Sequence, residues 1–264
     1  NQEKKYARKL WLDNVPDFIL ESDLENKYQV TFSNNPSAII GEYDAPEKQE
    51  QGIVMYHYLD DGNTIIYGTD GIERELFLNT LLYSTMRNYS SSQIQFYMID
   101  YGSESLRSYL SCPHVGGMVF ASEDEKYHNL LKMIREELHR KRILRDYGGE
   151  YHNYIESGKD DLPVQVMVLN NFDSIYENNP DIYELLPELV RDSERYGIIF
   201  IFTVNAFNSL PSKIAQNCRN IYAFHVKDND EYTSIFNQRV KVMPRDISGR
   251  GLLYNDGIHE FQVA

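Results

Sequence analysis

Short apolar runs that alternate with longer helical patterns constrain the fold of this chain more than any other feature of its sequence. The runs are rich in Ile, Val, Phe and Tyr and show little polar alternation, which is typical of strands buried on both faces. Strands that alternate with helices predict parallel βαβ units. We expect strands at 64–67, 94–99, 164–169, 198–204 and 221–226, and helices at 73–88, 123–147 and 180–196. The predicted fold is therefore α/β, with a mostly parallel sheet and helices on both faces.

The first 50 residues lack this pattern. They are polar, contain Pro16, Pro36 and Pro46, and show no regular period. We interpret residues 1–50 as a linker and lead-in segment, and residues 51–264 as the α/β domain. A chain of 264 residues is long enough for such a core.

Composition excludes several classes of function. The net charge of -14 opposes the phosphate backbone of nucleic acids, so DNA binding by this segment alone is disfavoured. Cys112 and Cys218 are far apart and form neither a disulfide framework nor a zinc motif, which favours a reducing compartment. The seven histidines lack metal-ligand spacing, so we expect no metal site. No apolar run reaches 18 residues, and we expect no membrane span.

Residues 65–82 have the layout of a P-loop, in which a strand, a glycine-containing turn and a helix follow one another. Backbone N–H groups and the helix N-terminus cradle phosphates in that motif. Such turns also occur without any nucleotide, and the turn alone leaves both interpretations open. The candidate nucleotide-binding residues in this turn are Gly68, Thr69, Asp70, Gly71, Glu73, Arg74 and Glu75.

Three of these residues differ from what the motif G-x-x-x-x-G-K-[ST] requires. Counted from Gly68, the second glycine is Glu73, the lysine is Arg74 and the hydroxyl residue is Glu75. A carboxylate about 5 Å from a phosphate charge costs roughly 3 kcal/mol at an effective dielectric constant of about 20. Arg74 keeps the positive charge, but its planar fork does not replace a compact ammonium group. These replacements predict that the chain binds ATP weakly or not at all.

The run at 164–169 ends where a P-loop ATPase carries its magnesium-binding and water-activating carboxylates. Here it ends in Asn170 and Asn171, whose neutral amides cannot act as a general base. Asp173 follows three residues past the strand end. We interpret Asp100, at the end of the run 94–99, as a turn residue. The sequence therefore predicts no catalytic residue in this chain.

Several separated segments together resemble the FtsK/SpoIIIE family, and in particular the EccC/EssC coupling ATPases of type VII secretion. Besides the P-loop position and the Asn-Asn strand, they are GEYDAPEKQEQ at 41–51, QFYMIDYGSESL at 95–106, PHVGGMV at 113–119, the helix at 136–142, RYGIIFIFTVNAF at 195–207 and GRGLLYNDGIHEFQVA at 249–264. They occur in the family's order, and the departures lie almost entirely at the catalytic positions. The chain resembles a C-terminal, degenerate module of such a protein.

The resemblance implies a P-loop NTPase-like (RecA- or FtsK-like) fold in which Thr203 and Asn205 would face the γ-phosphate. It also implies a hexamer-prone, membrane-anchored protein of Gram-positive bacteria, with this module at the cytoplasmic face. Its partners would be the preceding ATPase modules and secreted WXG-type substrates or adaptors. The opening LWLDNVP resembles the linker between modules, so Trp11 and Leu12 are candidates for docking into the preceding module.

Three hypotheses follow. The first is a pseudo-ATPase that recognises substrates and regulates active modules. The second is a residual ATPase that works only in an assembled hexamer. The third is DNA translocation, which the net charge of -14 disfavours.

Overall fold

The fold is built on one ten-stranded sheet with the strand order β2-β1-β10-β9-β8-β3-β7-β6-β4-β5. The computed structural model describes residues 12–137 and 140–264. The strands are β1 (Ser37–Ala45), β2 (Glu50–His57), β3 (Thr64–Tyr67), β4 (Ile94–Asp100), β5 (Val115–Phe120), β6 (Val164–Asn170), β7 (Ile198–Val204), β8 (Asn220–Ala223), β9 (Arg250–Tyr254) and β10 (Ile258–Val263).

The strands from β8 to β5 run parallel, as the sequence predicts. Every residue of β3, β6 and β7 is buried, which explains why these runs carry no polar alternation. The predicted strand at 221–226 is shorter than expected. It ends at Ala223 because His225 leaves the sheet and turns toward Glu73. The α/β fold with a mostly parallel sheet is confirmed.

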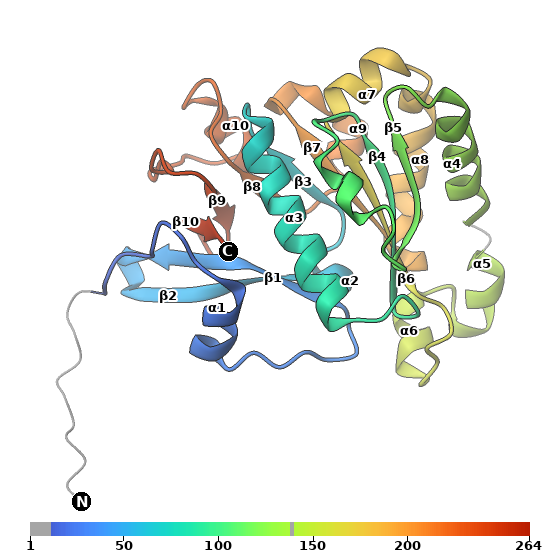
Figure 1. Ribbon diagram of the computed structural model, residues 1–264, viewed down its shortest axis with the longest axis horizontal. Coiled ribbons are helices and arrows are strands. Elements are labelled where there is room, and N and C mark those ends of the chain that lie inside the picture. The colour runs from blue at the N-terminus through green and yellow to red at the C-terminus, as the bar shows by residue number, and fades with distance from the viewer. Residues whose placement is uncertain (1–11, 138–139) are drawn as a thin grey trace, which may run out of the picture.

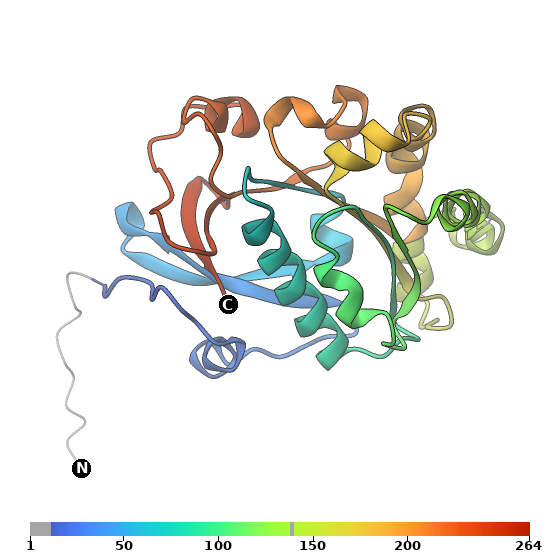
Figure 2. The same ribbon diagram turned by 45° about the horizontal axis from the view of Figure 1, so that its top comes forward.

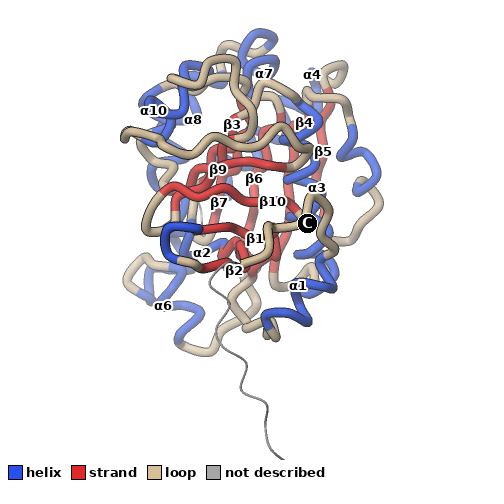
Figure 3. Tube along the Cα trace, turned by 90° about the vertical axis from the view of Figure 1, so that its left-hand side faces the viewer, coloured by secondary structure: helices blue, strands red, loops and turns tan. Residues whose placement is uncertain are grey.

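The remaining four strands, β9, β10, β1 and β2, are antiparallel and extend the sheet at one edge (Figure 3). The pattern of apolar runs does not predict them. At this edge β2 is mostly half-buried or exposed, and its side chains are mixed in polarity, so it lacks the apolar run of a central strand. The predicted boundary at residue 50 lies between β1 and β2, which pair in this sheet.

The α-helices are α1 (Glu21–Tyr28), α2 (Tyr58–Asp61), α3 (Gly71–Asn88), α4 (Asp124–Glu137), α5 (Arg140–Ile143), α6 (Tyr151–Glu156), α7 (Phe172–Asn178), α8 (Ile182–Ser193), α9 (Ser212–Ala215) and α10 (Glu231–Phe236). Figures 1 and 2 show α3 across one face of the sheet, with α4 and α8 on the other. The predicted helix 123–147 is divided into α4, α5 and a 3-10 turn (Leu144–Tyr147). Arg140 of α5 is buried, and it donates to the carbonyl of Tyr196.

The lead-in residues form a small core of their own against β1. Val15, Ile19 and Leu24 pack with Ile39 and are separate from the main cluster. Lys27 of α1 pairs with the buried carboxylate of Glu42. The lead-in segment is therefore packed against the sheet from Val15 onward.

Candidate functional site

The turn at the P-loop position lies at the carboxyl end of β3 and contains only residues 68–70 before α3 begins. Asp70 caps the helix by accepting a hydrogen bond from the N–H of Ile72 at 2.9 Å. The N–H of Thr69 donates to the carbonyl of His225 at 2.8 Å. Because α3 starts at Gly71, the residue at the motif's second glycine, Glu73, already lies in the first helical turn.

Arg74 packs back over this turn. A Cβ atom built on Gly68 would lie 3.3 Å from Cγ of Arg74, and one on Gly71 would lie 3.5 Å from its Nη2. Arg74 is only 5% exposed, and its Nε and Nη1 have no hydrogen-bond partner among the described residues. Burial lowers the pKa of Arg74, while Asp173, Glu75 and Asp70 favour its charged form. The guanidinium thus lies over the glycines of the motif and is balanced by carboxylates of the protein.

Glu73 binds a residue far along the chain. Its Oε1 lies 2.9 Å from Nδ1 of His225, and its Oε2 accepts from the backbone N–H of His225 at 3.3 Å. The other ring nitrogen of His225 lies 3.1 Å from the carbonyl oxygen of Arg245. The carboxylate at the motif's second glycine position therefore ties the start of α3 to the segment that follows β8.

Glu75 anchors the loop that follows β4. It accepts hydrogen bonds from the N–H of Ser103 at 2.9 Å and from its hydroxyl at 2.6 Å. Burial alone would raise the pKa of Glu75, but these hydrogen bonds outweigh it and hold the pKa below the usual 4.5. A Cβ at Gly102 would lie 2.6 Å from both Oε1 of Glu75 and Nδ2 of Asn170, so only glycine fits there.

The ends of β6, β7 and β4 are joined by a chain of buried hydrogen bonds. The hydroxyl of Thr203 donates to Oδ1 of Asn170 at 2.7 Å and accepts from the N–H of Asn171 at 2.7 Å. Nδ2 of Asn170 donates to Oδ1 of Asp100 at 2.8 Å. Thr203 is fully buried, so its hydroxyl faces Asn170 and Asn171 rather than the solvent.

Asp100 also belongs to this hydrogen-bonded group, which its interpretation as a turn residue did not predict. It does act as a turn residue, because Oδ1 accepts from the N–H of Gly102 at 3.0 Å. It is also fully buried beside Asn170, and its Oδ2 has no hydrogen-bond partner among the described residues. Burial raises the pKa of Asp100, and its hydrogen bonds to Asn170 and Gly102 offset this only in part. The parallel alignment of β4 and β6, with Asp100 opposite Asn170, brings these side chains together.

Asp173 lies in the first turn of α7 and accepts a hydrogen bond from the backbone N–H of Asn205 at 2.9 Å. This contact places residue 205 at the same edge of the sheet as the turn and the Asn-Asn pair. Of the two linker-docking candidates, Trp11 lies outside the described residues. Leu12 is 44% exposed.

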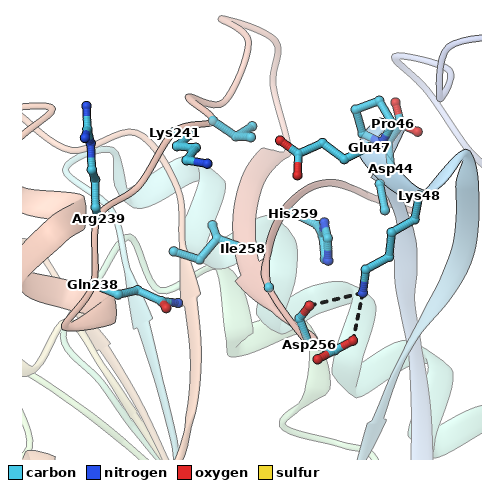
Figure 4. Close-up of a pocket in the computed structure, with 13 residues that line it drawn as sticks. Asp44, Pro46, Glu47, Lys48, Gln238, Arg239, Lys241, Asp256, Ile258 and His259 are labelled. Atoms are coloured by element: carbon cyan, nitrogen blue, oxygen red, sulfur yellow. Dashed lines mark hydrogen bonds and ion pairs between the residues drawn. The ribbon is translucent and has the colours of Figure 1, made fainter.

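A separate hollow of about 200 Å³ lies between the β1–β2 turn, the coil after α10 and the β9–β10 turn (Figure 4). It contains both cations and carboxylates, and Lys48 is paired with Asp256 at 2.8 Å. None of the P-loop candidates lines it. No helix within the described part of the chain has the length and apolar character of a membrane span.

Comparison with known proteins identifies the family. The sequence profile of the FtsK/SpoIIIE family matches residues 31–261. The ESX secretion system protein EccC of Geobacillus thermodenitrificans is 27% identical over 227 residues, which are 85% of this chain and 15% of that relative. The chain thus spans a small part of the length of such a relative.

Solved structures show the same fold. EssC (ATPases 2 and 3) from Geobacillus thermodenitrificans superposes with a TM-score of 0.81 at 26% identity, over 88% of this chain and 45% of that one. Thermomonospora curvata EccC (ATPases 2 and 3), solved in complex with a signal sequence peptide, gives a TM-score of 0.76 at 20% identity, over 88% and 43% of the two chains. The fold is therefore P-loop NTPase-like. The chain belongs to the FtsK/SpoIIIE family and is homologous to the ATPase domains of the EccC and EssC type VII secretion proteins.

Proposed function

We propose that this chain is a non-hydrolysing or weakly nucleotide-binding ATPase-like module of a type VII secretion coupling protein. The main observation behind this proposal is that carboxylates occupy the motif's second glycine position and its hydroxyl position. Both carboxylates are hydrogen-bonded to other residues of this chain. Glu73 is bound to His225 and Glu75 to Ser103. Each carboxylate within about 5 Å of a phosphate would cost roughly 3 kcal/mol, which is more than a hundredfold in affinity.

The residues at the positions where a P-loop ATPase activates water support the same proposal. Asn170 and Asn171 are neutral amides, and their hydrogen bonds go to Thr203, Asp100 and the carbonyl of Tyr101. The residues present do not fit a magnesium triphosphate, because the motif's hydroxyl is a carboxylate and the motif's loop is shortened by the early start of α3. We derive no hydrolytic step from this site.

We further propose that the module recognises secreted WXG-type proteins or their adaptors and transmits this to active ATPase modules of the same polypeptide. Support comes from the relative Thermomonospora curvata EccC, whose ATPases 2 and 3 were solved with a signal sequence peptide. In this proposal the module works at the cytoplasmic face of the membrane through the full-length protein, as part of a homo-hexamer.

The second candidate function is a residual ATPase that is active only in an assembled hexamer. Two observations favour it. Asp100 is a buried carboxylate with one oxygen, and Arg74 has two nitrogens, for which the described part of the chain provides no hydrogen-bond partner. A neighbouring subunit could supply what this site lacks. DNA translocation is disfavoured by the net charge of -14.

Isothermal titration of the chain with Mg-ATP, paired with a phosphate-release assay, tests the proposal. We expect no saturable binding below millimolar ATP and no release above the blank. The same two assays on the full-length hexamer, with the variant Arg74→Ala as a matched control, test the second candidate. Micromolar binding by the single chain together with steady phosphate release would refute the first function.

A further inference from the structure

One edge of the ten-stranded sheet is open. β2 is the outermost strand of the antiparallel group, and within the described chain it pairs only with β1 (Figure 3). The opposite edge, at β5, is closed at both ends of the strand. There the N–H of Val115 donates to the carbonyl of Cys112, and the N–H of Phe120 donates to the carboxylate of Glu123. β2 is therefore the edge that is open to a further strand.

The hydrogen bonds at the end of β2 show which of its residues face this open edge. The N–H of Tyr58 donates to the carbonyl of Pro36, on the side of β1, at 3.2 Å. The N–H of His57 instead donates to a carboxylate of α2 at 2.6 Å, away from β1. Because successive residues of a strand direct their backbone groups to opposite edges, Met55 and Ile53 face outward as His57 does. No described residue is hydrogen-bonded to the outward N–H and carbonyl groups of Met55 and Ile53.

The edge also lacks the features that usually prevent strand pairing. Edge strands of soluble proteins commonly carry Pro, Lys or a β-bulge. β2 contains neither Pro nor Lys, and the irregularity in its pairing lies on β1, at Ile40. A hollow of about 430 Å³ borders the strand at Ile53, Val54 and Met55, which leaves room beside these residues. An unprotected edge with free backbone groups is a template for pairing with another chain.

The sequence of β2 is complementary to itself about Val54. An antiparallel copy with Val54 opposite Val54 places Ile53 opposite Met55 and Gln51 opposite His57. Outward-facing residues then meet outward-facing residues, so the ladder hydrogen bonds form, and apolar side chains meet apolar ones. We propose that two copies of this chain associate through their β2 strands, antiparallel about a two-fold axis at Val54. This inference goes beyond the proposed function and does not depend on whether the chain binds ATP.

Sedimentation equilibrium of the purified chain tests the association. We expect a monomer–dimer equilibrium, and Ile53→Lys should weaken the dimer about tenfold or more, because it places a charge among the apolar side chains of the paired edges. The matched control Leu110→Lys changes an apolar residue that is 50% exposed and lies outside the antiparallel group, and it should leave the equilibrium unchanged. Because each copy carries a net charge of -14, added salt should strengthen the dimer by screening their repulsion.

Disulfide trapping tests the register and does not depend on the stability of Ile53→Lys. Cys112, a half-buried native thiol, is first replaced by Ser. In Val54→Cys the two-fold axis brings the two Cα atoms to about 4.5 Å, as a pair without hydrogen bonds, which a disulfide spans. Gln51→Cys is the control, because position 51 is less buried but its two copies would lie about 20 Å apart.

We expect mild oxidation to link two copies of Val54→Cys and to leave Gln51→Cys unlinked. Four results would overturn the proposal: a chain that stays monomeric at all concentrations, an oligomer larger than a dimer, a dimer that Ile53→Lys leaves intact, or cross-linking of Gln51→Cys as fast as that of Val54→Cys. ATP titration reports on the turn at the start of α3, so failure of one proposal does not imply failure of the other.

Discussion

Replacing Asp100 with asparagine should stabilise the protein at neutral pH. Asp100 is fully buried; its Oδ1 is hydrogen-bonded to Asn170 and Gly102, and the backbone of Leu106 also favours its charged form, but burial outweighs these contacts. Asparagine keeps that acceptor and replaces the unpartnered Oδ2 with a neutral donor next to the negative charge of Glu75. Removing an unsatisfied buried charge is worth about 1 kcal/mol or more.

The size of the thermal shift follows from the length of the chain. An unfolding entropy of about 2.1 cal/mol/K per residue gives roughly 0.55 kcal/mol/K for 264 residues. A gain of about 1 kcal/mol therefore raises the melting temperature by about 2 °C. Differential scanning calorimetry of the wild type and Asp100→Asn at pH 7 measures this directly.

The pH dependence gives a second readout. Because burial raises the pKa of Asp100 above 3.8, its ionised form destabilises the folded state. The penalty is complete above the folded pKa and disappears as the pH falls below 3.8. The advantage of Asp100→Asn should therefore shrink in acid. A matched change at Asp173, which accepts from the N–H of Asn205 and favours the charged form of Arg74, should destabilise instead.

A lower melting temperature for Asp100→Asn at pH 7 would refute this reasoning. It would mean that the ionised carboxylate stabilises the fold and that contacts such as that with the backbone of Leu106 outweigh the cost of burial. Loss of ATP turnover in the assembled hexamer with no change in stability would favour the residual ATPase, with Asp100 as its base.

Three further changes test the site and the sheet. Ser103→Ala removes the hydroxyl hydrogen bond to Glu75, keeps the backbone one, and should cost about 1 kcal/mol above pH 4.5. This loss should fade as Glu75 protonates, as urea unfolding at pH 3 and 7 would show. Thr203→Val leaves the N–H of Asn171 without its partner and should cost about 2 kcal/mol, whereas Thr203→Ser should cost less. Urea unfolding measures both costs. A cost below about 0.5 kcal/mol for Thr203→Val would contradict the contribution expected of a buried hydrogen bond. Gly41→Ala should prevent soluble folding, since its Cβ would lie 1.8 Å from a carbonyl oxygen of β10, and a native circular dichroism spectrum would disprove this.

The sequence predicts the central strands closely and the antiparallel edge not at all, for one physical reason. A strand buried on both faces must be apolar along its whole length, so β3 and β7 have the predicted bounds. The antiparallel strands include polar and charged side chains whose partners are distant in sequence. Glu42 of β1, for example, is bound by Lys27 and Tyr28 of α1. Such pairs have no local periodicity.

The candidate site shows the same division. The motif register places Glu73, Arg74 and Glu75 at the start of a helix, and the structure has them there. Their partners, His225 and Ser103, are not recognisable from sequence because they depend on the packing of loops against α3. The contact of Asp100 with Asn170 follows from strand order, which apolar runs alone do not determine.

These partnerships bear on whether a nucleotide site can be restored by simple reversion. Changing Glu75 to serine would remove the anchor of the loop at Ser103, and changing Glu73 to glycine would release His225. Neither change lengthens the turn of residues 68–70, because the cap at Asp70 starts α3 at Gly71. The phosphate cradle needs backbone N–H groups that converge on one point, and here the N–H of Thr69 is already bonded to the carbonyl of His225. Relief of the carboxylate repulsion alone is therefore not sufficient, and the reverted turn should still bind Mg-ATP no better than millimolar.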